Sequence, residues 1–124
     1  GYLDLNLIIQ EELQREGFPS WLALASIWAA DLFGGEKILE FSPKLAFINH
    51  ANRPIFAMHG TADTRVLPHH TEDMKLLGDL NGANLITWFV ENVGHSDIKY
   101  MNSQEFSDRI VKFFSNSLEG ELKP

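Results

Sequence analysis

Two short apolar runs on either side of a helical segment constrain the fold of this chain more than any other feature. "PIFAMHG" (54–60) and "NLITWFVE" (84–91) have the composition of buried strands, and the second is rich in β-branched and aromatic residues. Residues 69–80 between them have the apolar spacing of a helix. The residues of this helix that are predicted to face inward are Met74, Leu77 and Leu80. The order strand, helix, strand predicts a parallel unit of an α/β protein.

A last helix is predicted to follow the second strand. It begins near Asn102, because Glu105 three residues further on completes a start similar to a capping box. The apolar stripe predicted for this helix consists of Phe106, Ile110, Phe113, Phe114 and Leu118. Parallel sheets need both faces covered and their edges paired, so two strands alone make a poor sheet. We therefore expect a sheet whose other strands are not in this sequence.

The first fifty residues predict helices and no clear strand. Asp4 can cap a helix that runs through about Glu16. An apolar helix starts after Ser20 and ends at Gly34–Gly35, and a short helical turn starts at Ser42–Pro43. The apolar helix carries apolar residues on more than one face, so either a larger body buries it or it lines a pocket or a partner surface. We assign residues 1–50 to a helical segment and 51–124 to the strand and helix unit.

Composition excludes several classes of function. The formal net charge is −7 and no Lys/Arg cluster occurs, which argues against binding to nucleic acid or to an anionic membrane surface. Cysteine is absent, which excludes disulfides, thiolate nucleophiles and cysteine-ligated metals. A chain without cysteine is compatible with a reducing compartment, so a cytoplasmic location is expected. The first residues do not have the pattern of a signal peptide.

An acid and a histidine each follow one of the predicted strands. Asp63 lies in "HGTADTRVLPHH" and His95 lies in "ENVGHSDIKY". Functional groups of open α/β sheets lie beyond the carboxyl ends of strands, so adjacent parallel strands bring these loops together. A carboxylate bonded to one imidazole nitrogen orients the ring, and the other nitrogen can then act as a general base. Gly60 and Gly94 are predicted to let the backbone turn tightly before each group.

Plainer interpretations compete with this one. Asp63 is also a residue type that favours turns by hydrogen-bonding its own backbone, and Asp97 is a rival acid that we expect to cap or solvate the following turn. His59 is expected to be packed and hydrogen-bonded at the end of its strand. A zinc site would draw on imidazole and carboxylate ligands, although the spacing matches no familiar ligand motif. The candidate metal ligands are His59, Asp63, His69 and His70, of which the last two are also expected to open a helix. The aromatic residues Trp21, Trp28 and Phe33 line an acyl pocket or take part in ordinary packing.

The two loops resemble those of the α/β-hydrolase family, and most of all those of esterase-like and prolyl-oligopeptidase-like serine hydrolases. "RPIFAMHGTADTRVLPHH" (53–70) is similar to the family's acid-bearing strand and loop, and "ENVGHSD" (91–97) is similar to its histidine loop. The resemblance covers residues 42–118 and implies that Asp63 is the triad acid, that His95 is the triad base, and that no cofactor is used. It also implies an α/β fold that is the C-terminal portion of an α/β-hydrolase fold. The last two parallel strands and their flanking helices would then follow a segment of cap-side helices.

The nucleophile has no candidate in this sequence. The chain order in the family is Ser, acid, His, so the serine should precede Asp63 on a G-x-S-x-G turn. No such motif occurs, and Ser26 lies inside a predicted helix without flanking glycines. We therefore expect the C-terminal part of a serine hydrolase for carboxylic esters or for peptide amides, whose nucleophile lies on a part of the parent protein absent from this chain. This chain alone is expected to be inactive.

The expected partners follow from this hypothesis. They are the small-molecule ester or peptide substrate, the missing N-terminal half, and a second copy of the chain that pairs through an open strand edge. No nucleic acid and no membrane is expected. Two functions of other classes stay open, namely a non-catalytic α/β binding module with a hydrolase-like shape and a small metal-binding domain.

Overall fold

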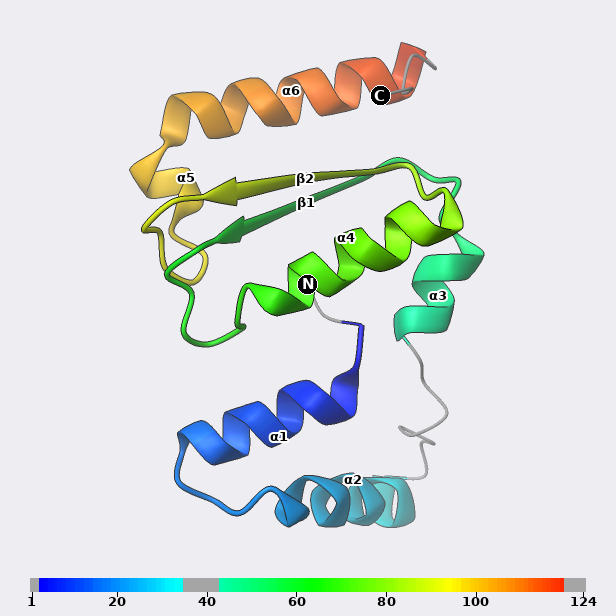
Figure 1. The fold of residues 1–124 in the computed structure, drawn as a ribbon, viewed down its shortest axis with the longest axis vertical. Helices are drawn as coiled ribbons and strands as arrows, with labels where there is room; N and C mark the ends of the chain where they lie inside the picture. The colour runs from blue at the N-terminus through cyan, green and yellow to red at the C-terminus, as the bar shows by residue number, and fades with distance from the viewer. Residues whose placement is uncertain (1–2, 35–42, 120–124) are drawn as a thin grey trace. The chain divides into compact units, whose positions relative to one another are not determined.

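The computed structural model describes residues 3–34 and 43–119 of the chain (Figure 1). Gly35 and Ser42, which the sequence places at the ends of helices, lie outside the described residues. The chain divides into two compact units, Tyr2–Phe47 and Ile48–Pro124.

The first helix of the unit Tyr2–Phe47 has the two ends that its sequence predicts. In α1 (Leu5–Arg15), the Leu7 backbone N–H donates to Oδ1 of Asp4 over 3.0 Å, so Asp4 is the predicted N-cap. The helix ends at Arg15, and Gly17 just beyond its C-cap Glu16 has a φ of 83°, in the left-handed region that follows many helices.

The second helix of this unit, α2 (Trp21–Gly34), packs against α1. Its buried residues are Ala23 and Ile27. Its exposed large apolar residues are Trp21, Leu24, Trp28, Leu32 and Phe33. The prediction that apolar residues occupy more than one face of this helix is therefore confirmed. The short helix α3 (Pro43–Asn49) begins at Pro43 as predicted, and the boundary between the units falls within it.

The unit Ile48–Pro124 is built on a sheet of two parallel strands, so the predicted mixed α/β class is confirmed. Strand β1 (Ile55–Gly60) pairs with β2 (Leu85–Val90) in a register that sets Ile55 opposite Leu85 and Gly60 opposite Val90. Both strands lie where the apolar runs predict them. Helix α4 (His69–Asn81) connects them and lies on one side of the sheet, while α6 (Ser103–Glu119) lies on the other (Figure 1).

The buried apolar cluster of this unit lies under α6. It consists of Trp88, Val90, Val93 and Ile98, with Phe56, Met58 and Phe106 packed against it. Phe56 also stacks on Phe113 of α6 with 5.6 Å between ring centroids, and the Arg109 guanidinium lies 4.6 Å above the Trp88 ring. This packing fixes α6 on the sheet, because stacked aromatic pairs and cation–π contacts add to the burial of apolar area.

Helix α4 buries most of the face that the sequence predicts, and Leu80 is the exception. Its buried residues are His70, Thr71 and Gly78, and the predicted residues Met74 and Leu77 are half-buried. Leu80 is 75% exposed, so the prediction that it faces inward is wrong. Leu80 lies two residues beyond Gly78, which is roughly 200° further around a helix of 3.6 residues per turn.

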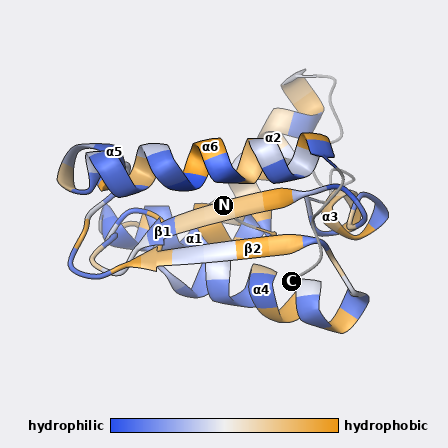
Figure 2. Cartoon of the chain, turned by 90° about the horizontal axis from the view of Figure 1, so that it is seen from above, coloured by the Kyte–Doolittle hydropathy of each residue, from blue (hydrophilic) through white to orange (hydrophobic). Residues whose placement is uncertain are grey.

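The C-terminal helices also differ in detail from the prediction. A short helix, α5 (Ile98–Met101), precedes α6 and was not expected. Helix α6 begins directly after Asn102 as predicted. Hydrophilic and apolar residues are interspersed along the helix (Figure 2). The half-buried members of the predicted stripe are Phe106, Ile110 and Phe113. Phe114 and Leu118 are exposed, so the buried stripe is narrower than the apolar stripe in the sequence.

Candidate active site

The loops that follow the two strands are joined by hydrogen bonds between their backbones. The Thr61 N–H donates to the Val90 carbonyl over 2.9 Å, and the Ala62 N–H donates to the Val93 carbonyl over 3.0 Å. The Asn92 N–H donates to the Thr61 hydroxyl over 2.9 Å. The acid loop and the histidine loop therefore meet beyond the carboxyl ends of the strands, where the parallel order predicts a site.

Gly60 makes this meeting possible by having no side chain. A Cβ atom at Gly60 would overlap the Val93 carbonyl group, the same group that accepts the Ala62 hydrogen bond. Gly60 is not among the residues with positive φ, so close approach and not a tight turn explains this glycine. Around His95, the left-handed positions are Asn92 (φ 59°) and Ser96 (φ 61°), and not the predicted Gly94.

Asp63 and His95 form a direct hydrogen bond. The distance from Nδ1 of His95 to Oδ2 of Asp63 is 2.8 Å. The Asp63 side chain is 6% exposed and the His95 side chain is 38% exposed. The carboxylate therefore holds Nδ1 from inside the protein, while the imidazole reaches the surface.

The second oxygen of Asp63 fixes its own loop. Oδ1 accepts from the backbone N–H groups of Arg65 and Val66 over 2.9 and 3.0 Å. This is the turn that an aspartate at this position favours. The turn interpretation and the functional interpretation are therefore both satisfied by one carboxylate, with a different oxygen for each.

Opposing effects set the pKa of Asp63. Burial is the largest single effect and by itself raises the pKa of the carboxyl group. The hydrogen bonds from His95, Val66 and Arg65, together with the charge of His95, favour the carboxylate and outweigh burial. The net result is that the pKa of Asp63 lies below its usual value.

His59 is packed and hydrogen-bonded at the end of β1, as the sequence predicts. Its Nδ1 lies 2.6 Å from the Thr71 hydroxyl and its Nε2 lies 2.7 Å from the Val66 carbonyl. The same Nε2 lies 3.3 Å from Oδ2 of Asp63. This contact with the acid was not predicted. Its signal in the sequence is a polar residue on the face of β1 that α4 covers, four residues before Asp63.

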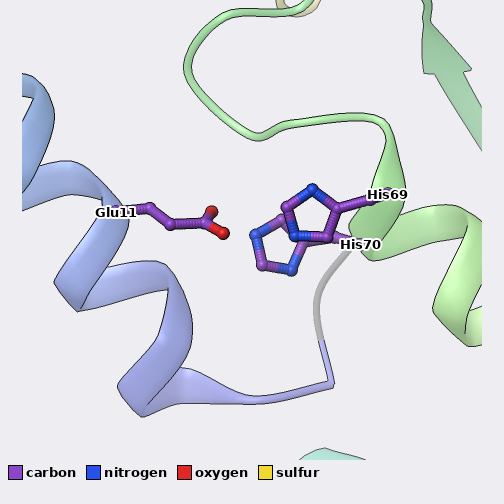
Figure 3. Close-up of side chains that lie close together, drawn as sticks. All are labelled: Glu11, His69 and His70. Atoms are coloured by element: carbon purple, nitrogen blue, oxygen red, sulfur yellow. The ribbon is translucent and has the colours of Figure 1, made fainter.

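His69 and His70 open α4, as predicted, and their rings lie 4.3 Å apart between centroids (Figure 3). Glu11, which Figure 3 also labels, belongs to α1 in the other unit. In the sequence, His69 and His70 are candidate metal ligands together with His59 and Asp63. Within the described residues, no three of these four side chains bring their ligand atoms within 4.8 Å of one another. The structure does not assemble the metal site that was considered.

The rival acid and the serines take other places. Asp97 lies at the N-cap position of α5, as predicted, although its side chain makes no capping hydrogen bond. Ser26 lies within α2, as predicted. Among the serines in the described part of the chain, none is hydrogen-bonded to His95. The aromatic residues Trp21, Trp28 and Phe33 are exposed on α2.

The pair of Asp63 and His95 has a defined chemical capacity. A carboxylate accepting from Nδ1 keeps the hydrogen on that nitrogen, so the lone pair of the neutral ring is on Nε2. A nitrogen in this state can take a proton from a hydroxyl group or from water. The same carboxylate stabilises the imidazolium that results.

Comparison with known proteins adds no relative. No family model matches the chain, and no curated protein or solved structure is significantly similar to it. In the part of the chain that is described, none of the helices has the length and apolar content needed to cross a membrane.

Replacing Gly60 by alanine is expected to destabilise the protein by about 2–3 kcal/mol, since the new methyl group forces the two loops apart. Urea unfolding of Gly60→Ala measures this loss. The matched control is Gly34→Ala, because a Cβ at Gly34 has no neighbour within 4 Å among the described residues. That variant should unfold at the same urea concentration as the parent chain or at a slightly higher one. Equal stability of the two variants would contradict the close approach at Gly60.

Replacing Asp63 by asparagine is expected to cost about 1–3 kcal/mol near neutral pH, because it weakens several buried hydrogen bonds at once. A lowered pKa in the folded state stabilises the protein above the unfolded pKa of about 3.9, and the effect is lost as pH falls through the folded value.

The difference in unfolding free energy between the parent chain and Asp63→Asn should therefore shrink between about pH 5 and pH 3. Asp73→Asn, at an exposed position of α4, is the control and should shift stability by less than about 0.5 kcal/mol at either pH. A difference that stays constant or grows towards pH 3 would rule out a lowered pKa for Asp63.

Proposed function

We propose that this chain supplies the acid and the base of a serine hydrolase of the α/β-hydrolase type, and that its fold is the C-terminal portion of that fold. The observation that carries the proposal is the 2.8 Å hydrogen bond between Asp63 and His95. The bond joins loops that follow adjacent parallel strands. The resemblance of both loops to those of esterase-like and prolyl-oligopeptidase-like enzymes supports the same assignment.

The proposed reaction is hydrolysis of a carboxylic ester or a peptide amide through an acyl-serine. The serine oxygen attacks the substrate carbonyl while His95 Nε2 takes the proton of the serine hydroxyl. His95 then gives that proton to the leaving group. In the second half, His95 takes a proton from water, which attacks the acyl-serine, and returns it to the serine oxygen. Asp63 orients the ring and stabilises its charged form in both halves.

The nucleophile is proposed to lie on polypeptide outside these 124 residues. The sequence has no G-x-S-x-G motif, and no serine in the described ranges is bonded to His95. In the family that the loops resemble, the serine precedes the acid along the chain. A strand that carries it would also extend the two-stranded sheet.

Labelling of the protein made by its natural source with a fluorophosphonate probe tests this proposal. We expect an intact mass above 14.1 kDa and one probe adduct per molecule. In the same full-length protein, His95→Ala and Asp63→Asn should slow labelling by about four orders of magnitude, as loss of a triad member does elsewhere. Asp97→Asn, a carboxylate change within the same loop, should label at the parent rate. The isolated 124-residue chain should not turn over p-nitrophenyl esters.

A mass of 14.1 kDa without an adduct would overturn the proposal. It would favour the second candidate, a non-catalytic α/β binding module, which the lack of a serine bonded to His95 among the described residues also suits. In a binding module, Asp63→Asn and His95→Ala should leave function intact.

The proposed partner of the isolated chain is a second copy that covers its apolar surface. Trp28 and Phe33 of α2 are 67% and 86% exposed, and a two-stranded parallel sheet leaves outer edges that invite pairing. We expect light scattering to show a dimer or a larger assembly. Trp28→Ser should shift it towards monomer, whereas Val111→Ser, which removes an exposed apolar residue of α6, should not. A monomeric parent chain would contradict this expectation.

A further inference from the structure

We propose that His59 is a positioning residue that holds the acid loop in place, so that Asp63 presents its carboxylate to His95. This inference rests on the proposed function for its catalytic meaning, but its geometry stands on the described residues alone. His59 is 4% exposed at the end of β1, where an apolar side chain would be the ordinary choice.

The neighbours of the His59 ring determine which nitrogen carries the hydrogen. Nε2 lies 2.7 Å from the Val66 carbonyl oxygen, which can only accept, so Nε2 must donate. The 3.3 Å contact of the same nitrogen with Oδ2 of Asp63 is a second, longer contact with an acceptor. The Thr71 hydroxyl, 2.6 Å from Nδ1, donates to that nitrogen. One tautomer of His59 therefore satisfies all three neighbours.

These hydrogen bonds, together with the 3.3 Å approach of His59 to Asp63, close a ring of polar contacts around the acid loop. Val66 donates its N–H to Oδ1 of Asp63 and accepts from His59 with its carbonyl. Oδ2 of Asp63 lies near both imidazoles, at 2.8 Å from His95 and 3.3 Å from His59. Each oxygen of the carboxylate is therefore held from a different side, and rotation of the carboxylate breaks at least one contact.

Thr71 anchors this ring to the first turn of α4. It is fully buried, and its hydroxyl reaches His59 from the helix that covers this face of the sheet. The acid loop is thus tied to β1 through the His59 backbone and to α4 through Thr71. This explains how the acid loop can hold a fixed geometry opposite a partly exposed histidine.

Imidazole NMR on the 124-residue chain is the first measurement. We expect His59 to carry its hydrogen on Nε2 and His95 to carry its hydrogen on Nδ1, so the two rings show opposite tautomers. The His95 Nδ1–H resonance then reports the bond to Asp63 directly. A His59 ring with its hydrogen only on Nδ1 would overturn the proposal.

Substitution of His59 tests its role as a positioning residue. In His59→Leu we expect the His95 Nδ1–H to exchange with water about tenfold faster or more, as for the loss of a hydrogen bond to a charged group. His59→Gln can offer an amide N–H near the place of Nε2 and should restore most of the protection. Thr71→Val, which keeps the shape but loses the hydroxyl, should have an intermediate effect.

Two results would overturn the proposal. The first is unchanged exchange of the His95 proton in a folded His59→Leu chain, with folding checked by the Trp88 side-chain resonance. Should His59→Leu fail to fold, unchanged exchange in Thr71→Val would have the same meaning.

In the complete hydrolase, His59→Leu should lower kcat by about tenfold with little change in KM, because a misplaced acid affects the transition state more than substrate binding. The two proposals fail separately. Altered His95 exchange without any fluorophosphonate labelling leaves the positioning role intact and removes the hydrolase. Normal labelling with unaltered exchange in His59→Leu does the opposite.

Discussion

The parallel pairing of β1 with β2 is the constraint on which the rest of the site depends. Since Gly60 is opposite Val90, both strands end at the same level and on the same side. The residues that follow β1 then bond to the end of β2 and to its loop, where Thr61 and Ala62 donate to the carbonyl groups of Val90 and Val93. An antiparallel pair would send the two loops to opposite ends of the sheet. The acid and the histidine, 32 residues apart in sequence, come within 2.8 Å because the pairing is parallel.

The electrostatics of the site follow from this packing. Bringing the loops together buries Asp63, and burial alone would favour its neutral form. The same packing supplies the backbone N–H groups of Arg65 and Val66 and the imidazole of His95, and these donors restore the carboxylate. Among the described residues, no buried side-chain nitrogen or oxygen lacks a partner. A complete set of donors is what allows a carboxylate to stay charged away from water.

The sequence predicts the elements well because their signals are local. The capping residue Asp4 and the two apolar runs each lie within or next to the element that they predict. The structure has the helix and both strands in those places. The pair of Asp63 and His95 is also predictable, since it needs only the strand order. Leu80 shows the limit of such signals. Which side of α4 meets the sheet depends on the partner surface, and there the small Gly78 and the polar His70 and Thr71 lie inward.

Other features depend on contacts that no local pattern reveals. Gly60 is needed because the carbonyl group of Val93, a residue 33 positions away, approaches it closely. The prediction that Gly60 serves a tight turn was therefore wrong about the reason for this glycine. Asn92 and Ser96 of the histidine loop are left-handed, and although asparagine is enriched in that conformation, serine is not, so the sequence does not mark Ser96 for it. His59 could be placed in the interior from its strand alone. Its contacts with Val66 and Thr71 needed the three-dimensional path of the acid loop.

The polar groups around Asp63 have their hydrogen-bond partners within the described chain, whereas many large apolar side chains are not buried by it. Within the described residues, the hydrogen bonds around Asp63 close on themselves through segments 59–71 and 90–97. Several large apolar residues of α2 and of the second half of α6 are exposed, and each outer edge of the sheet has no further strand paired to it in the described chain. Hydrogen bonds are directional and short, so a small segment can satisfy them alone, whereas apolar burial is roughly proportional to area and needs a larger body. The hydrogen bonds of the acid and the histidine are therefore satisfied within one small unit, whereas large apolar residues of the described chain stay exposed.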